Sequence, residues 1–440
     1  MHFPFSGSTF SARLLLLVVA LYGTSAQAIP IESITGKPPT SAALPPEAAA
    51  NLEFRKGIDA GLKRKNNVAK SHFLAALKLD AKFTPAMIGL ADIAQKEGDR
   101  AQAEKYLIQA ESAAPQAAEV HLAWGRFYVS TRQFEKAEFS FKQAINLNPK
   151  SVTPLLELGD LYLTMDASRR NDAVKTFATA MELAPDNKFA AYSFGVASAL
   201  IGRQEDALSA FEKAATLAPK DPAPLRAIGR LYMETGALDK ALNAFDRGLK
   251  RQPNFLALML DRGDALARQG KWAEAIRQIS AAAKIAPASS EIQIKLGDAY
   301  QGAKRWDDSR SAYAKAIAMN SKNPLAHNNL AWMLLQQGGS PAKAVESAKQ
   351  AVSLAPNSAP FLDTLGWAQR AAGDLPAAAE SLRRATDIEP KSGEFQLHYG
   401  IVLIELKRTA EAQQALNRAL DPQFPGAGEA RKLLRSLQAN

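Results

Sequence analysis

The sequence contains no cysteine among its 440 residues. Disulfide bonds are therefore excluded, whatever compartment the protein occupies. The absence also excludes the attachment site of a bacterial lipoprotein, which needs a cysteine to carry its lipid. If the protein is exported, we expect it to hold its fold by packing alone.

Long apolar runs are almost absent. One run covers residues 14–22, directly after Arg13, and the small residues of Ala26-Gln27-Ala28 follow it. This order is typical of a secretory signal peptide, with cleavage after Ala28. No other stretch reaches about 18 apolar residues, so we expect no membrane span after cleavage. The sequence predicts a periplasmic protein, and an uncleaved signal that anchors it in the membrane is the alternative.

Catalytic motifs are also missing. The sequence has no phosphate-binding loop ending in Gly-Lys-Ser/Thr and no His-Glu-x-x-His motif, and residues 29–440 hold no Gly-x-Ser-x-Gly elbow. Those residues contain four histidines at no metal-ligand spacing: His72, His121, His327 and His398. We therefore expect no catalytic residue, no metal and no cofactor, and we interpret the protein as a non-enzyme.

Acidic residues are fewer than basic ones, 44 against 54, which gives a formal net charge of +10. A basic surface favours anionic partners, among them lipid head groups, acidic polysaccharides and acidic proteins. Export argues against nucleic acid. Both signs are interspersed along the chain, so an ordinary solvated surface is the other interpretation.

A small residue recurs at intervals of 34 to 36 residues through most of the chain. A period of 34 predicts an array of helical repeats, each of which buries its apolar face against its neighbours. The recurrent small residues are Gly57, Ala91, Gly125, Gly159, Gly195, Gly229, Gly263, Gly297, Ala331, Gly366 and Gly400.

Two other features keep the same register. A large residue follows the small one after 16 residues, or 18 where two residues are inserted: Phe73, Leu107, Phe141, Phe177, Phe211, Phe245, Ile279, Tyr313, Leu382 and Leu416. Proline, which lacks the N–H that a helix interior needs, closes eight units: Pro115, Pro149, Pro185, Pro219, Pro253, Pro287, Pro356 and Pro390.

This pattern resembles the tetratricopeptide repeat (TPR), which has two antiparallel helices and a turn in each unit. The resemblance implies an all-α, right-handed superhelical solenoid of about eleven helix-turn-helix repeats with a C-terminal capping helix. We expect four segments: a signal peptide at 1–28, a proline-rich flexible tether at 29–48, the repeat array at 49–424, and the capping helix at 425–440.

The resemblance also implies a binding groove. In this family the first helix of each pair lines the concave face, and ligand contacts usually come from the second, fifth, sixth, ninth, twelfth and thirteenth residues, if the recurrent small residue is counted as the eighth. The middle repeats place mixed charges there, including Arg226 and Arg230. Solvation of a wide face is the alternative to binding.

The ninth and tenth repeats place a distinct set at these positions. We predict a partner-binding groove there, because indole rings and arginine are frequent interface anchors and an asparagine amide bonds to a peptide backbone through both donor and acceptor. The alternative for the two tryptophans is packing between adjacent first helices. The predicted residues are Asn328, Asn329, Trp332, Asp363, Trp367 and Arg370.

Residues 323–437 carry a narrower resemblance. The strings Asn328-Asn329-Leu330-Ala331-Trp332 and Leu362-Asp363-Thr364-Leu365-Gly366-Trp367, with Phe424-Pro425-Gly426 near the end, are similar to exported bacterial TPR proteins, including the one found with exosortase and exopolysaccharide gene systems. This resemblance implies a periplasmic scaffold or adaptor for a protein or peptide partner, in envelope assembly or exopolysaccharide export. Two alternatives remain open: direct binding of an anionic polysaccharide, and an accessory subunit of a glycosyltransferase or protease.

Overall fold

The computed structural model describes residues 45–336 and 339–439. The predicted signal peptide, and the predicted tether as far as residue 44, lie outside these residues. Within them the chain forms 23 α-helices, one short 3₁₀ helix and no β-strand. The chain divides into two compact units, residues 1–231 and 232–440, which are described separately.

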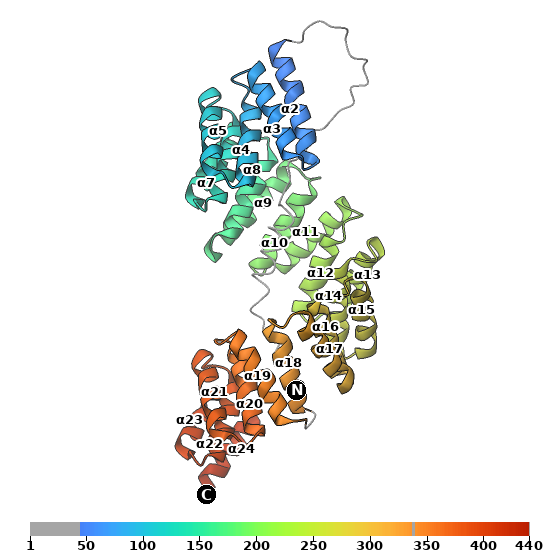
Figure 1. Cartoon of the computed structure of the whole chain (residues 1–440), viewed down its shortest axis with the longest axis vertical. Helices are drawn as coiled ribbons and strands as arrows, with labels where there is room; N and C mark the ends of the chain where they lie inside the picture. Colours follow the sequence, from blue (N-terminus) through green and yellow to red (C-terminus); the bar gives the residue numbers. More distant parts are fainter. Residues whose placement is uncertain (1–44, 337–338, 440) are drawn as a thin grey trace. The chain divides into compact units, whose positions relative to one another are not determined.

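Unit 1 is a series of helix pairs in chain order (Figure 1). It contains α2 (Pro46–Leu62), α3 (Asn66–Leu79), α4 (Thr84–Glu97), α5 (Arg100–Ala113), α6 (Ala118–Ser130), α7 (Phe134–Leu147), α8 (Val152–Thr164), η1 (Ala167–Arg169), α9 (Arg170–Leu183), α10 (Lys188–Leu200), α11 (Gln204–Leu217) and most of α12 (Ala223–Glu234).

Unit 2 continues the same alternation and ends in a single helix. It contains α13 (Leu238–Arg251), α14 (Leu256–Arg268), α15 (Trp272–Ile285), α16 (Ser290–Gly302), α17 (Trp306–Met319), α18 (Pro324–Gln336), α19 (Pro341–Leu354), α20 (Ala359–Ala371), α21 (Leu375–Ile388), α22 (Gly393–Glu405), α23 (Thr409–Arg418) and α24 (Ala427–Ala439).

The helix ends follow from local chemistry. In most pairs, the link between the two helices places one residue in the left-handed conformation, such as Gly98 at φ 82°, which glycine adopts without a Cβ penalty. Asp99 then accepts a hydrogen bond from the backbone N–H of Gln102 and caps α5. Pro115 lies in the link between α5 and α6, so proline separates consecutive pairs as predicted.

The first helix begins slightly earlier than expected. α2 starts at Pro46, so residues 46–48 belong to the array and not to the tether. Proline is tolerated in a first turn because its missing N–H has no intrahelical partner there. At the other end, α24 lies within the expected capping segment and packs Ala430 and Leu434 against Leu397 and Leu416.

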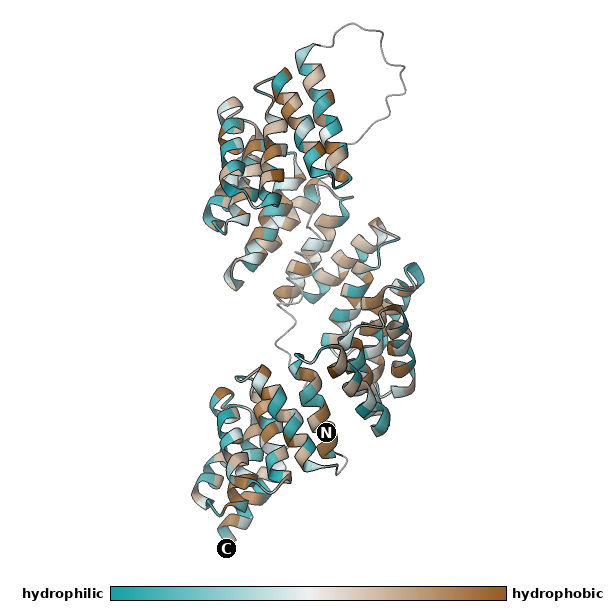
Figure 2. Cartoon of the chain, in the orientation of Figure 1, coloured by the Kyte–Doolittle hydropathy of each residue, from teal (hydrophilic) through white to brown (hydrophobic). Residues whose placement is uncertain are grey.

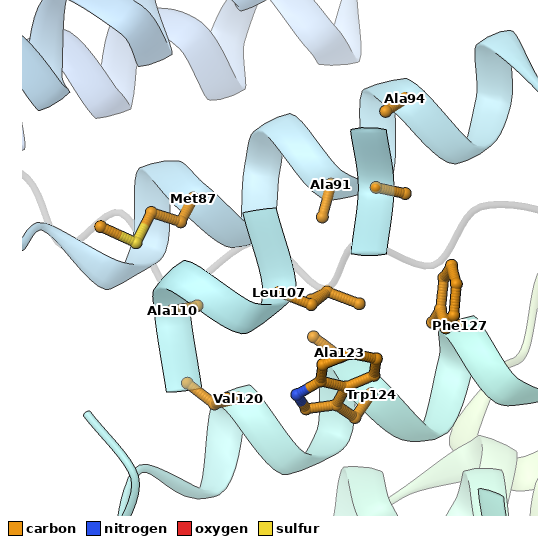
Figure 3. Close-up of a cluster of buried hydrophobic side chains, with 10 residues drawn as sticks. Met87, Ala91, Ala94, Leu107, Ala110, Val120, Ala123, Trp124 and Phe127 are labelled. Atoms are coloured by element: carbon orange, nitrogen blue, oxygen red, sulfur yellow. The ribbon is translucent and has the colours of Figure 1, made fainter. Parts of the chain in front are cut away.

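The large residues of the repeat form the core of each unit. All ten are at most 4% exposed: Phe73, Leu107, Phe141, Phe177, Phe211, Phe245, Ile279, Tyr313, Leu382 and Leu416. Figure 3 shows Leu107 of α5 between Ala91 of α4 and Ala123 of α6. The large side chain thus fills the space between its own pair and the next.

The small residues leave room for these large ones. A Cβ added to Gly57 would lie 2.6 Å from Phe73 Cδ1, and one added to Gly297 would lie 2.6 Å from Tyr313 Cδ1. Both distances are far below van der Waals contact, so the two helix backbones approach as closely as they do only because the eighth position is small. Apolar and polar residues alternate along the helices (Figure 2), as expected for helices that each bury one stripe.

Two glycines of α2 provide a matched test of this contact. Gly57→Ala places a methyl group against Phe73, and we expect it to destabilise the first repeat by about 1–3 kcal/mol through overpacking. Gly61→Ala meets no atom within 4 Å and should gain up to about 1 kcal/mol from helix propensity. Hydrogen exchange of α2 and α3 measures both changes locally. Equal effects of the two substitutions would contradict the packing account.

Candidate functional site

The predicted site residues lie on three first helices. Arg226 and Arg230 lie on α12 in unit 1; Asn328, Asn329 and Trp332 lie on α18; and Asp363, Trp367 and Arg370 lie on α20 in unit 2. The predicted set therefore belongs to two separate groups. In unit 2, Asn329, Asp363 and Trp367 contact residues of neighbouring repeats.

A ladder of side-chain contacts runs along the first helices. In each step the ninth residue of one repeat meets the sixth residue of the next, 31 positions later. Arg126 Nε donates to Glu157 Oε1 at 2.8 Å in unit 1. In unit 2, Lys295 Nζ lies 2.6 Å from Asp264 Oδ2, and Asn329 Nδ2 donates to Asp298 Oδ1 at 2.9 Å. We call the predicted groove positions of the first helices, which include these two, the first-helix face.

Trp367 continues the ladder toward the C-terminus. Its indole stacks on the imidazole of His398, with 4.2 Å between ring centroids, and Arg370 lies 4.5 Å from the same indole centroid. Arg370 also pairs with Glu405 on the next first helix, with Nε 2.9 Å from Oε1. Trp367 therefore packs between adjacent first helices, the arrangement that was the alternative to groove contact.

Asp363 and His398 form a nearly buried pair beside this indole. Asp363 is 5% exposed, and His398 Nδ1 lies 2.8 Å from its Oδ1. Burial lowers the pKa of His398, but the charge and hydrogen bond of Asp363, with the nearby charge of Glu394, outweigh burial and raise that pKa above its usual value. The pair holds a positive imidazolium over a wider pH range than a free histidine does.

Trp332 differs from Trp367. It is half-buried, and within the described chain its ring has no stacking or cationic partner. Asn328, four residues earlier on the same helix, has a buried Oδ1 without a hydrogen-bond donor, while its Nδ2 makes only a 3.4 Å contact with Asn329 Oδ1. On α18, an indole and an amide acceptor one helical turn apart thus lack these partners within the described residues.

Asn329 has a structural role that the sequence did not reveal. It donates to Asp298, which also accepts from the Tyr313 hydroxyl at 2.6 Å. Burial raises the pKa of Asp298 to about 6, although Tyr313, Lys295 and Asn329 oppose this change. The 31-residue offset between Asp298 and Asn329 is visible in the sequence, but only once the register of neighbouring helices is known.

Unit 1 carries its own charges on the first-helix face. Arg226 and Arg230 are half-buried and lie close enough to Tyr192 of α10 to affect its pKa, which burial raises to about 12 while the two arginines oppose the rise. These arginines thus adjoin a phenol on the preceding first helix. Their predicted role in partner binding remains a prediction.

The histidines have partners inside the fold. His72 Nδ1 lies 2.7 Å from Glu53, His121 and His327 each lie 3.0 Å from a backbone carbonyl, and His398 pairs with Asp363. Among the described residues, no group of three or more histidine, aspartate or glutamate side chains is arranged to hold a metal ion. No helix in the described ranges has both the length and the apolar character to cross a membrane.

Comparison with known proteins identifies the repeat. One tetratricopeptide repeat profile matches residues 88–152, 156–222, 226–290 and 294–359, and a second matches residues 369–437. Among curated proteins no sequence match was found. The matching profiles indicate no catalytic family. Together with the eleven helix pairs and the final helix of the described residues, they confirm the predicted fold class, an all-α TPR solenoid.

Solved structures also match the chain, at low sequence identity. The crystal structure of yeast Tom70 matches with a TM-score of 0.50 and 14% identity, covering 89% of this chain and 96% of that chain. The Cut9–Hcn1 hetero-tetramer of the APC/C matches with a TM-score of 0.44 and 14% identity, covering 88% and 96%. MamA from Desulfovibrio magneticus RS-1 matches with 0.35 and 23%, covering 38% and 94%.

The Asp363–His398 pair generates a pH prediction. Because the folded-state pKa of His398 is raised, its contribution to stability is complete below the unfolded pKa of about 6.5 and is lost as pH rises through the folded value. We expect the stability of α20–α22 to fall as pH rises from about 6.5 through the folded pKa of His398. Hydrogen exchange, corrected for intrinsic rates, measures this stability. His398→Gln keeps a donor but carries no charge and should remove that fall. An unchanged pH profile in the variant would contradict the assignment.

Proposed function

The chain belongs to the tetratricopeptide repeat family, and from this premise we propose that it is a non-catalytic scaffold or adaptor that captures a peptide segment or protein surface on its first-helix face. Repeats of this kind indicate protein partners. We place the main contact on α18, in unit 2. The observation that carries this choice is the pair of unoccupied groups on that helix, the Trp332 indole and Asn328 Oδ1.

The other predicted groove residues of unit 2 already bind neighbouring side chains. Asn329, Asp363, Trp367 and Arg370 all have partners within the fold. A ligand would have to break those contacts before it could use the same groups, so we assign these residues to holding the face in shape. Trp332 and Asn328 can bind without such a loss.

The two available groups also suit a peptide. A half-buried indole supplies a large apolar surface at low entropic cost, because few rotatable bonds are fixed on binding. A buried carbonyl oxygen without a donor gains a hydrogen bond when a backbone N–H of the partner reaches it, and leaving it unpaired costs about 1–3 kcal/mol. Together they favour a partner that presents an extended segment with one apolar side chain.

For the compartment and the process, our proposal rests on the sequence alone. We propose that the signal peptide is cleaved after Ala28 and that the mature protein acts in the periplasm. We further propose envelope assembly or exopolysaccharide export as the process, on the resemblance of residues 323–437 to exported TPR proteins. Cleavage after Ala28 is tested by the N-terminal sequence of the mature protein purified from its native cells.

In-cell crosslinking tests the binding face. A photoreactive residue in place of Trp332 should capture a specific protein, whereas one in place of Lys349, an exposed residue on the second helix of the same repeat, should not. Asn328→Ala should weaken that partner's binding about tenfold, because the acceptor for its backbone N–H is lost.

The control for the crosslinking test is that each variant folds. Each variant must show the helical content and hydrogen exchange of the parent protein. Capture from Lys349 and not from Trp332, or no capture by a folded Trp332 variant, would contradict the proposed face.

A further inference from the structure

One carboxylate on the first-helix face of unit 1 lacks the partner that its counterparts have. Asp160 occupies the ninth position of its repeat, on α8. At the same position in unit 2, Asp264 pairs with Lys295 and Asp298 accepts from Asn329 and Tyr313. Asp160 Oδ1 is buried and accepts no hydrogen bond from any described residue.

The charges around Asp160 do not compensate for the missing hydrogen bond. One helical turn earlier on α8 lies Glu157, whose negative charge faces Asp160. The cation nearest to Glu157 is Arg126, which donates to both of its oxygens, at 2.8 and 3.0 Å. Arg126 also faces Asp92, which Lys96 approaches on α4. The guanidinium is thus held by Glu157, and Asp160 has only a like charge beside it.

This arrangement is costly for the free protein. A buried oxygen that accepts no hydrogen bond loses its hydration without compensation, and a like charge adds to the loss. Burial and the charge of Glu157 raise the pKa of Asp160 to about 8, so the carboxyl is mostly protonated at neutral pH. A donor that carries a positive charge would relieve both problems at once.

We propose that Asp160 anchors a positively charged side chain, a lysine or an arginine, of the segment bound along the first-helix face of unit 1. This inference rests on the proposed function and adds the chemistry of a second contact, in a different unit from Trp332. The partner's cationic residue would lie beside Glu157 and Asp160. It would supply the positive charge that neither Arg126 nor Lys96 gives to Asp160.

Binding of a cation at Asp160 should release a proton. Below pH 8 the free carboxyl carries a proton, and a bound ammonium or guanidinium group favours the carboxylate. Binding therefore transfers the Asp160 proton to solvent, leaving a carboxylate paired with the ligand cation. Calorimetry in two buffers with different ionisation enthalpies measures this release, which a merely structural role of Asp160 would not produce.

The experiment compares three synthetic peptides on the full-length protein. They are acetyl-Leu-Ala-Lys-Ala-Leu-amide and its counterparts with arginine or norleucine in place of lysine. Norleucine keeps the aliphatic stem and removes the charge. We expect the lysine or arginine peptide to bind about tenfold more tightly than the norleucine peptide, with release of close to one proton at pH 7.

Two variants make the test specific. Asp160→Asn should remove both the preference for a cation and the proton release, whereas Asp186→Asn, the same substitution at an exposed position of unit 1, should keep both. Equal binding of charged and uncharged peptides would overturn the anchor while leaving the binding face intact. Absence of binding by all three would also overturn it, and Trp332 crosslinking then decides the proposed function separately.

A measurement without ligand guards against a folding artefact. Since the folded pKa of Asp160 is raised from its ordinary value to about 8, the stability of the α8–α9 pair should be greatest near pH 4 and fall as pH rises to about 8. Asp160→Asn should fold and remove this slope. A variant that unfolds, or one that keeps the slope, would contradict the isolated carboxylate.

Discussion

The contact between a small residue on the first helix and a large residue on the second sets the spacing of everything else in this protein. Phe73 fills the space beside both Gly57 of its own pair and Gly89 of the next, so one side chain positions three helices. Repetition of this contact fixes the separation and offset of consecutive first helices within a unit. The ladder on the first-helix face depends on that offset, because a 31-residue pairing exists only when neighbouring repeats keep one register.

The ladder in turn decides which groups remain for a ligand. Most charged and amide side chains on the face are occupied by a neighbour, as Lys295 is by Asp264 and Arg126 is by Glu157. Partly buried ion pairs of this kind contribute modest stability but fix geometry, because removing one partner leaves the other uncompensated. We propose that recognition depends on the exceptions, such as Asn328 and Trp332 in unit 2 and Asp160 in unit 1.

The sequence predicted the repeat, the eleven pairs and the capping helix, because each depends on residue size at a fixed period. It also placed the site residues on first helices. It did not distinguish the role of Asn329 from that of Asn328, because the two residues are adjacent. Nor did it distinguish Trp367 from Trp332, because both occupy the same position of their repeats. That distinction depends on side-chain partners across neighbouring helices, such as His398 for Trp367 and Asp298 for Asn329. A search for complementary residues 31 apart would have found these pairs once the register was known.

The central claim is that partners bind the first helices and not the second ones. The lack of native cysteine makes single-cysteine labelling a direct test. Cysteines introduced at Leu325 and Gln336, exposed positions of α18 on either side of Asn328 and Trp332, and at the second-helix positions Lys349 and Arg383, would be labelled with a maleimide in native cells and in the purified protein. The account predicts slower labelling in cells at the first two positions only. Protection confined to Lys349 and Arg383, or equal rates at all four positions, would contradict it.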